Sequence, residues 1–144
     1  MPDNHQTRAL AQLLQWKRLQ ALAEQREALS AAARVASVDR HIETIDGRVA
    51  AEAALLADYA DAPALGLWAS AMDRRRDGLL RRRATEQRQA AALAARAAAA
   101  AVAAERHKDL LDLERGKLHE QHQRARERAD WEALALLFAS LPRR

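Results

Sequence analysis

The chain has 144 residues, enough for one domain, and 49% of them are apolar although aromatic residues make up only 3%. Alanine supplies most of that apolar share, so the chain cannot build a thick globular core, and its composition is typical of a coiled coil or long helix. The net charge is +4, and the absence of cysteine excludes a disulfide scaffold and a thiolate zinc site. We expect a soluble, cytoplasmic protein, because no signal-peptide pattern and no membrane-length apolar stretch is found.

The first predicted element is a helix over residues of about 6–60. Apolar residues recur every seven positions from Leu14 to Leu56, and Ala31, Val38 and Ile45 supply a second seam position. A sustained heptad of this kind indicates a coiled coil. Four leucines are expected to broaden the apolar stripe toward the N-terminus: Leu10, Leu19, Leu22 and Leu29.

Pro63 and Gly66 predict a turn over about 61–66, followed by a second helix over about 66–140. This second helix carries its own seven-residue row: Ala90, Ala97, Ala104, Leu111, Leu118 and Ala125. The predicted fold is therefore all-α, a single long antiparallel two-helix coiled-coil hairpin over residues 1–144.

Residues 90–104 contain thirteen alanines or valines, interrupted only by Leu93 and Arg96. Alanine is the strongest helix former, and its small side chain allows a neighbouring helix to approach closely. A turn centred near residue 63 would place this alanine tract opposite Val35 and Val38.

The two predicted helices differ in length, at roughly 80 Å and 110 Å for a rise of 1.5 Å per residue. About twenty residues at the end of the second helix should therefore extend past the first. This segment holds the richest apolar cluster of the chain, which we expect to be an interface: Trp131, Leu134, Leu136, Leu137 and Phe138.

No catalytic, cofactor-binding or metal-binding constellation is present in the sequence. No Gly-rich phosphate loop occurs, and His119 and His122 are three apart where the metalloprotease helix needs four. We interpret them as two exposed histidines, and His107 as a polar residue tolerated beside the seam.

The arginine-rich run at residues 74–83 has three interpretations. Residues 1–72 are net negative and residues 73–88 carry net charge +4, so the run can pair with acids of the first helix: Asp39, Glu43, Asp46 and Glu52. It can instead bind an acidic protein, or nucleic acid, although no stacking aromatics are interleaved with it. Near the turn, Trp68, Met72, Tyr59 and Leu65 either plug the hairpin or form a binding patch.

The layout and two segments resemble the FliJ family, the stalk and general chaperone of the flagellar type III export apparatus, and its YscO-like virulence counterparts. The segments are LGLWASAMDRRRDGLL at the midpoint and LLDLERGKLHEQHQRARERADWEALA near the C-terminus. The resemblance implies a non-enzymatic, cofactor-free hairpin that sits beside the cytoplasmic membrane through its partners. Those partners are a hexameric export ATPase (FliI-like), an export gate protein (FlhA-like) and escort chaperones.

The resemblance also implies two sets of partner-binding residues. The ATPase would be contacted by the terminal end, through Leu10, Leu14, Arg124, Arg126, Arg128 and Trp131. The gate would be contacted by the end that carries the turn, through Tyr59, Trp68, Met72 and Leu79. Two other functions remain open at this point, a basic nucleic-acid-binding hairpin and a generic dimerising coiled coil.

Overall fold

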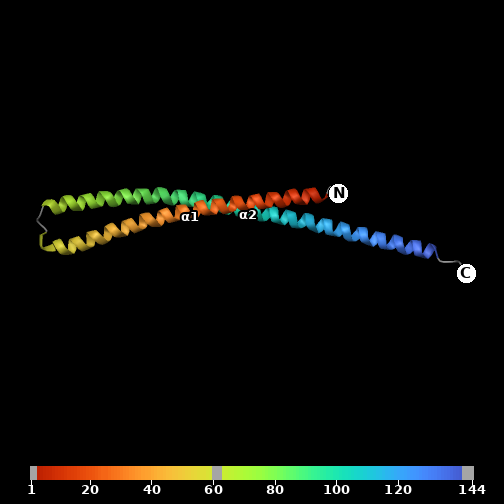
Figure 1. The fold of residues 1–144 in the computed structure, drawn as a ribbon. Helices are drawn as coiled ribbons and strands as arrows, with labels where there is room; N and C mark the ends of the chain where they lie inside the picture. The colour runs from red at the N-terminus through yellow and green to blue at the C-terminus, as the bar shows by residue number, and fades with distance from the viewer. Residues whose placement is uncertain (1–2, 60–62, 141–144) are drawn as a thin grey trace. The chain divides into compact units, whose positions relative to one another are not determined.

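The computed structural model describes residues 3–59 and 63–140. It contains helix α1 (Asp3–Leu56), a short 3-10 helix η1 (Ala57–Tyr59) and helix α2 (Pro63–Ala139), with no strand among the described residues. The two long helices have 54 and 77 residues and pack against each other (Figure 1). The predicted two-helix hairpin with a longer second helix is confirmed.

The chain forms two compact units, each made from a piece of both helices. We call residues 20–100 the tip unit, because they include the turn, and residues 1–19 with 101–144 the terminal unit. In the tip unit the two helix segments run antiparallel on either side of the turn (Figure 1).

The turn lies earlier in the chain than the sequence predicts. Helix α1 ends at Leu56 and continues as one 3-10 turn to Tyr59, whereas α2 already begins at Pro63. Proline is tolerated in the first turn of a helix because the amide hydrogen it lacks would have no partner inside that helix. Pro63 therefore starts the second helix instead of interrupting the chain before it.

Two heptad rows on each helix form the seam between α1 and α2. The buried residues all lie on these rows: Leu14, Ala31, Val38, Ile42, Ile45, Ala104 and Leu111. The row of α2 that includes Leu111 was predicted. Its second row was not, and it consists of partly buried residues of mixed chemistry: Leu65, Met72, Leu79, Glu86, Leu93, Ala100, His107 and Glu114.

Four ion pairs among the described residues show which positions of α1 and α2 lie opposite each other in the tip unit. They join Arg34 to Glu86, Arg76 to Asp46, Arg83 to Asp39 and Arg96 to Glu24. In each pair the two residue numbers sum to 120 or 122, whereas a turn centred near residue 63 would require about 126. The expected pairing of Val35 and Val38 with the alanine tract is therefore wrong.

The reason for this shift is the early start of α2 at Pro63, which moves every residue of α2 relative to α1. In the observed register, Val35 and Val38 lie opposite the segment that contains Arg83 and Glu86. The alanine tract, in its part within the tip unit, lies opposite residues 20–30, where Glu24 receives Arg96. It thus faces mainly small or polar residues of α1.

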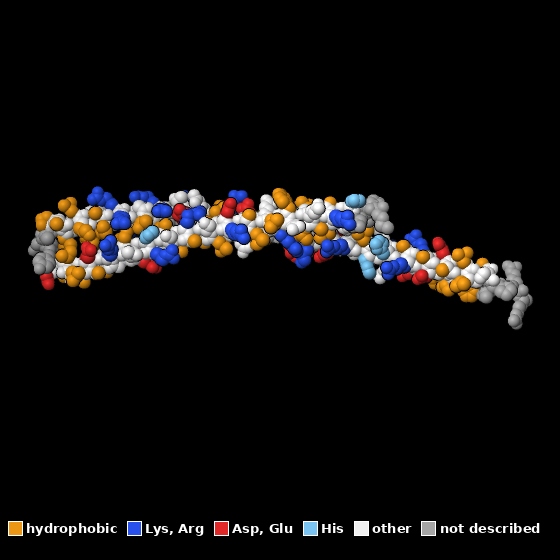
Figure 2. Space-filling model, viewed as in Figure 1, with side chains coloured by type: hydrophobic (Ala, Val, Ile, Leu, Met, Phe, Trp, Pro, Cys, Tyr) orange, Lys and Arg blue, Asp and Glu red, His pale blue; other side chains and the backbone are white. Residues whose placement is uncertain are grey.

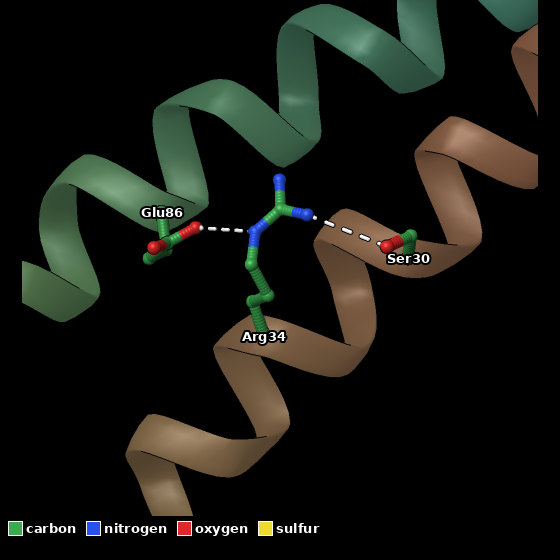
Figure 3. Close-up of polar contacts among 3 residues, drawn as sticks. All are labelled: Ser30, Arg34 and Glu86. Carbon is green, nitrogen blue, oxygen red and sulfur yellow. Dashed lines mark hydrogen bonds and ion pairs between the residues drawn. The ribbon is translucent and has the colours of Figure 1, made fainter.

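The Arg34–Glu86 contact shows how a charged residue is accommodated in the seam (Figure 3). Glu86 occupies a seam position, and its Oε2 accepts a hydrogen bond of 3.0 Å from Nε of Arg34. The same guanidinium donates from Nη1 to Oγ of Ser30 at 3.4 Å. Exposed ion pairs contribute only about 0–1 kcal/mol, so this contact adds little to the stability of the hairpin.

Candidate partner-binding surfaces

The C-terminal part of α2 has no partner helix within the terminal unit. Every described residue from His119 to Ser140 is exposed, whereas Leu111 is buried and Leu118 is half-buried. We call residues 119–139 the overhang. The predicted extension of the second helix past the first is confirmed, and Figure 2 shows apolar side chains gathered at its end.

The apolar residues of the overhang do not continue the seam. Beyond Leu118 the two seam rows contain no large apolar residue, only Gln121, Ala125, Arg128, Glu132, Ala135 and Ala139. Trp131, Leu134 and Phe138 instead share a face that lies about 100° around the helix from the seam, at 3.6 residues per turn. Trp131 is 72% exposed and Phe138 is 71% exposed. The overhang therefore offers a face that differs from the one α2 uses to bind α1.

The residues predicted for the ATPase-facing end divide into three groups. Leu14 is only 7% exposed and Leu10 is half-buried, so both support the hairpin from inside rather than offer a surface. Arg124 lies seven residues before Trp131 and hence on the same face, and its Nη2 is 3.8 Å from Oε2 of Glu120. Arg128 lies three residues before Trp131, on a seam row beside that face, whereas Arg126 lies on another side of the helix; both are exposed.

The residues predicted for the gate-facing end are mostly half-buried in the tip unit. Trp68, Met72 and Leu79 are each partly covered, which agrees in part with a role as a plug between the helices. The side chain of Tyr59 lies outside the described part of the structure. Two leucines that the sequence reasoning did not single out, Leu55 and Leu67, are 74% and 73% exposed.

The arginine run is divided between paired and unpaired side chains. Nε of Arg76 donates to Oδ1 of Asp46 at 2.7 Å, and this hydrogen bond together with the charge of Asp46 raises the pKa of Arg76. Nε of Arg83 lies 2.5 Å from Oδ1 of Asp39 in an ion pair, without the alignment of a hydrogen bond. Structural pairing with the first helix therefore accounts for two of the six arginines in the run.

The other arginines of the run are exposed and bind no acid among the described residues. Nε of Arg74 donates to the carbonyl oxygen of Ser70, one turn earlier on the same helix. Arg75 and Arg82 line a groove between the two helices, together with Met72 and Leu79. This groove has three arginines and no acidic residue in its lining.

The histidines occupy positions that suit ordinary structural roles. His119 and His122 are exposed beside a shallow groove that also involves Thr7, Arg8 and Leu118. His107 is half-buried in the seam, with Nδ1 2.8 Å from the carbonyl oxygen of Ala103. No group of three or more potential metal ligands occurs within residues 3–59 and 63–140.

A further exposed apolar strip follows the outside of α1 in the terminal unit. Trp16 is 57% exposed with Nζ of Lys17 5.1 Å from its ring centre, and Leu13 and Leu19 lie within one turn of it. Leu19, Leu22 and Leu29 were expected in the seam stripe, and that expectation is wrong. They are exposed because they occupy neither seam row of α1, which the phase of the heptad from Leu14 already indicates.

Within the described ranges, no helix is long and apolar enough to cross a membrane. Comparisons with protein-family models, with curated proteins and with solved structures found no match to this chain.

Proposed function

We propose that this protein is a non-enzymatic stalk and general chaperone of a type III protein export apparatus, either flagellar or of the virulence type. Its overhang binds a hexameric export ATPase, and its tip unit contacts the export gate and escort chaperones. The observation that carries this proposal is the overhang, a fully exposed helical end with an apolar face of its own. The resemblance of the midpoint and C-terminal segments to the FliJ family adds the identity of the partner.

The arrangement of each unit fits the demands on a stalk. A component that enters the pore of a ring must be narrow, and each unit is at most two helices across. It must also resist bending, and α2 runs for 77 residues without an interruption. A component that joins two partners needs two different surfaces, and the apolar overhang differs in chemistry from the basic groove of the tip unit.

The proposal is tested by assaying the cognate export ATPase with and without this protein. We expect the protein to promote hexamer assembly and raise ATP turnover, and to be captured by the ATPase in a pull-down. No effect on assembly or turnover, together with no capture, would refute the proposal.

Substitutions in the overhang test whether its apolar face makes the contact. Leu134→Ala combined with Phe138→Ala should weaken ATPase binding at least tenfold, because buried aromatic and aliphatic anchors dominate interface energies. Leu136→Ala is the matched control, since Leu136 is also exposed but lies on another side of the helix. Arg124→Glu should likewise weaken binding more than Arg126→Glu, because only Arg124 shares the face of Trp131. Equal effects within both comparisons would show that this face is not the contact.

A second candidate function, a dimerising coiled coil, is favoured by the same exposed apolar residues. Two overhangs could cover each other's Trp131 and Phe138 in a homodimer. Sedimentation at several protein concentrations separates the two functions, since a dimer would gain mass with concentration and a monomeric stalk would not. In a dimer, Leu134→Ala with Phe138→Ala would lower the mass in the absence of any ATPase.

A further inference from the structure

The groove between α1 and α2 in the tip unit has a lining of unusual composition. Its floor is apolar, with Ile45 buried and with Met72 and Leu79 half-buried. Its edges carry positively charged or titratable groups from both helices, in two pairs spaced seven residues apart: His41 with Arg48 on α1, and Arg75 with Arg82 on α2. Thr44 completes the lining, and its Oγ1 donates to the carbonyl oxygen of Arg40.

The arginines of this groove are uncompensated, in contrast to their neighbours in the sequence. Arg76 and Arg83, each one residue further along α2, form ion pairs with Asp46 and Asp39. Arg48, Arg75 and Arg82 form no ion pair or hydrogen bond within the described ranges. Charge is thus neutralised on one edge of the seam and left positive on the other, and Figure 2 shows basic side chains on both helices.

We propose that this groove binds an acidic amphipathic helix of a partner protein. Such a helix would place apolar side chains on the floor formed by Ile45, Met72 and Leu79. Its carboxylates would reach Arg48 on one edge and Arg75 and Arg82 on the other. Binding of an amphipathic helix in a groove with apolar anchors is a common mode of peptide recognition, and the flanking charges select an acidic partner.

A peptide fits this groove better than nucleic acid does. A single-stranded nucleic acid binds through aromatic side chains on which its bases stack, and the lining contains none. Duplex DNA is bound largely through contacts to its phosphates, and an apolar floor makes no such contact. Arg75 and Arg82 are seven residues apart, which is about 10 Å along a helix. Two turns of a partner helix cover the same distance, so side chains two turns apart on that helix match the two arginines.

The groove lies in the tip unit, which the proposed function assigns to the export gate and escort chaperones. The inference is argued from the lining of the groove, so the isolated protein suffices to test it, and its failure would leave the ATPase contact of the overhang untouched. The probe is a fluorescein-labelled helical peptide with a leucine row flanked by glutamates, and its binding is followed by fluorescence anisotropy. Two further peptides, one with glutamine for glutamate and one with alanine for leucine, test the charged and apolar contributions. A labelled single strand and a labelled duplex of DNA serve as competing probes.

The key variant is Arg75→Glu with Arg82→Glu, and its matched control is Arg74→Glu with Arg81→Glu. Both pairs have the same spacing and the same change in net charge, but only the first lines the groove. We expect the first pair to weaken peptide binding about tenfold or more and the second by less than about twofold, because close charge pairs dominate over distant ones. Arg48→Glu, on the opposite helix, should act like the first pair.

Equal losses in both arginine pairs would overturn the proposal, because they would show general electrostatic attraction without a groove site. Peptide binding that survives replacement of the leucines would do so too, since the floor would then play no part. Tighter binding of either DNA probe than of the peptide, lost on Arg75→Glu with Arg82→Glu, would assign the groove to nucleic acid instead. Circular dichroism of each variant checks that its helical content is retained. If a charge reversal to glutamate unfolds the hairpin, Arg75→Gln with Arg82→Gln replaces it in the test, because glutamine adds no negative charge.

Discussion

Individual side chains contribute very unequally to this hairpin, because a seam between two helices has room for few buried residues. Leu111 is 2% exposed, while its neighbour Leu110 is 51% exposed. Two leucines adjacent in the chain therefore have opposite roles, one in the seam and one in contact with water.

Leu111→Ala should lower the free energy of unfolding of the terminal unit by about 2–4 kcal/mol, from lost burial and the cavity left behind. Leu110→Ala is the control and should change it by less than about 1 kcal/mol, because alanine is also a good helix former. Urea denaturation followed by circular dichroism measures both. A larger loss for Leu110→Ala would contradict the placement of the seam in this unit.

The sequence alone identifies the buried residues where they are apolar and correctly phased. Leu14, Ile42, Val38 and Leu111 all lie on rows that the heptad predicts, and all are buried. Prediction was less successful where the seam position is polar. Glu86 carries no hydrophobic signal, and only its contact with Arg34 shows that it lies between the helices.

At the scale of the helices, small residues determine how closely α1 and α2 approach. Ala31 is 0% exposed although its side chain is one methyl group, so α2 must come very near to its backbone. The observed register places Ala31 opposite Ala90, where the alanine tract begins. The close contact between α1 and α2 in this part of the tip unit therefore requires alanine on both helices.

Ala31→Phe should lower the unfolding free energy by about 1–3 kcal/mol, because a well-packed contact has no space for the ring. Ala32→Phe is the matched control: Ala32 is exposed, and the change there should cost only the lower helix propensity, roughly 0.5 kcal/mol. Thermal denaturation compares the two variants. Similar midpoints would show that the helices are not closely packed at Ala31.

Helix content and order follow from the sequence, whereas the register does not. Long runs without glycine or proline define two helices, but their pairing depends on where the turn lies. Pro63 has two possible roles, as a breaker in the turn or as the first residue of a helix, and the sequence pattern does not distinguish them. An error of a few residues in the position of the turn shifts every predicted pair along the seam by the same amount, including the pairs of Val35 and Val38.

At the scale of the whole molecule, the residues of α2 that pack against α1 end before the candidate ATPase contact begins. No described residue beyond Leu118 is buried, so the overhang adds little to the stability of the hairpin. The candidate ATPase contact, in contrast, consists of overhang residues such as Trp131 and Phe138.

A chain that ends at Arg124 should keep its unfolding free energy within about 1 kcal/mol, because only exposed surface is removed. Deletion of residues 1–20 should destabilise the terminal unit strongly, since it removes Leu14 from the seam. Denaturation by urea compares the two truncations, and ATPase capture should be lost in the first. Marked destabilisation by the C-terminal truncation would show that the overhang has a partner within the chain.

The chemistry of the overhang could be located in the sequence, but its orientation could not. The cluster around Trp131 is evident from composition, and the excess length of the second helix indicates that it is exposed. The predicted row through Leu111 and Leu118 gives only one of the two seam rows. The second row, which includes Glu86, His107 and Glu114, carries little apolar signal, and without it the direction of the seam relative to this cluster is undetermined.

The basic groove was harder to predict, because the sequence does not show which arginines of the run are paired. Arg76 and Arg83 form ion pairs, whereas Arg75 and Arg82 form none among the described residues.

The polar seam positions of the overhang also bear on self-assembly. In a hairpin with one helix longer than the other, the unpaired end of the longer helix can pair with a second copy of the chain. If each copy binds the next in this head-to-tail way, the product is an open-ended filament. Gln121, Arg128 and Glu132 occupy seam positions of the overhang, and no large apolar residue lies on these rows beyond Leu118. A further copy of α1 would therefore bury less apolar surface on the overhang than α1 buries within the hairpin, which disfavours polymerisation through the pairing interface.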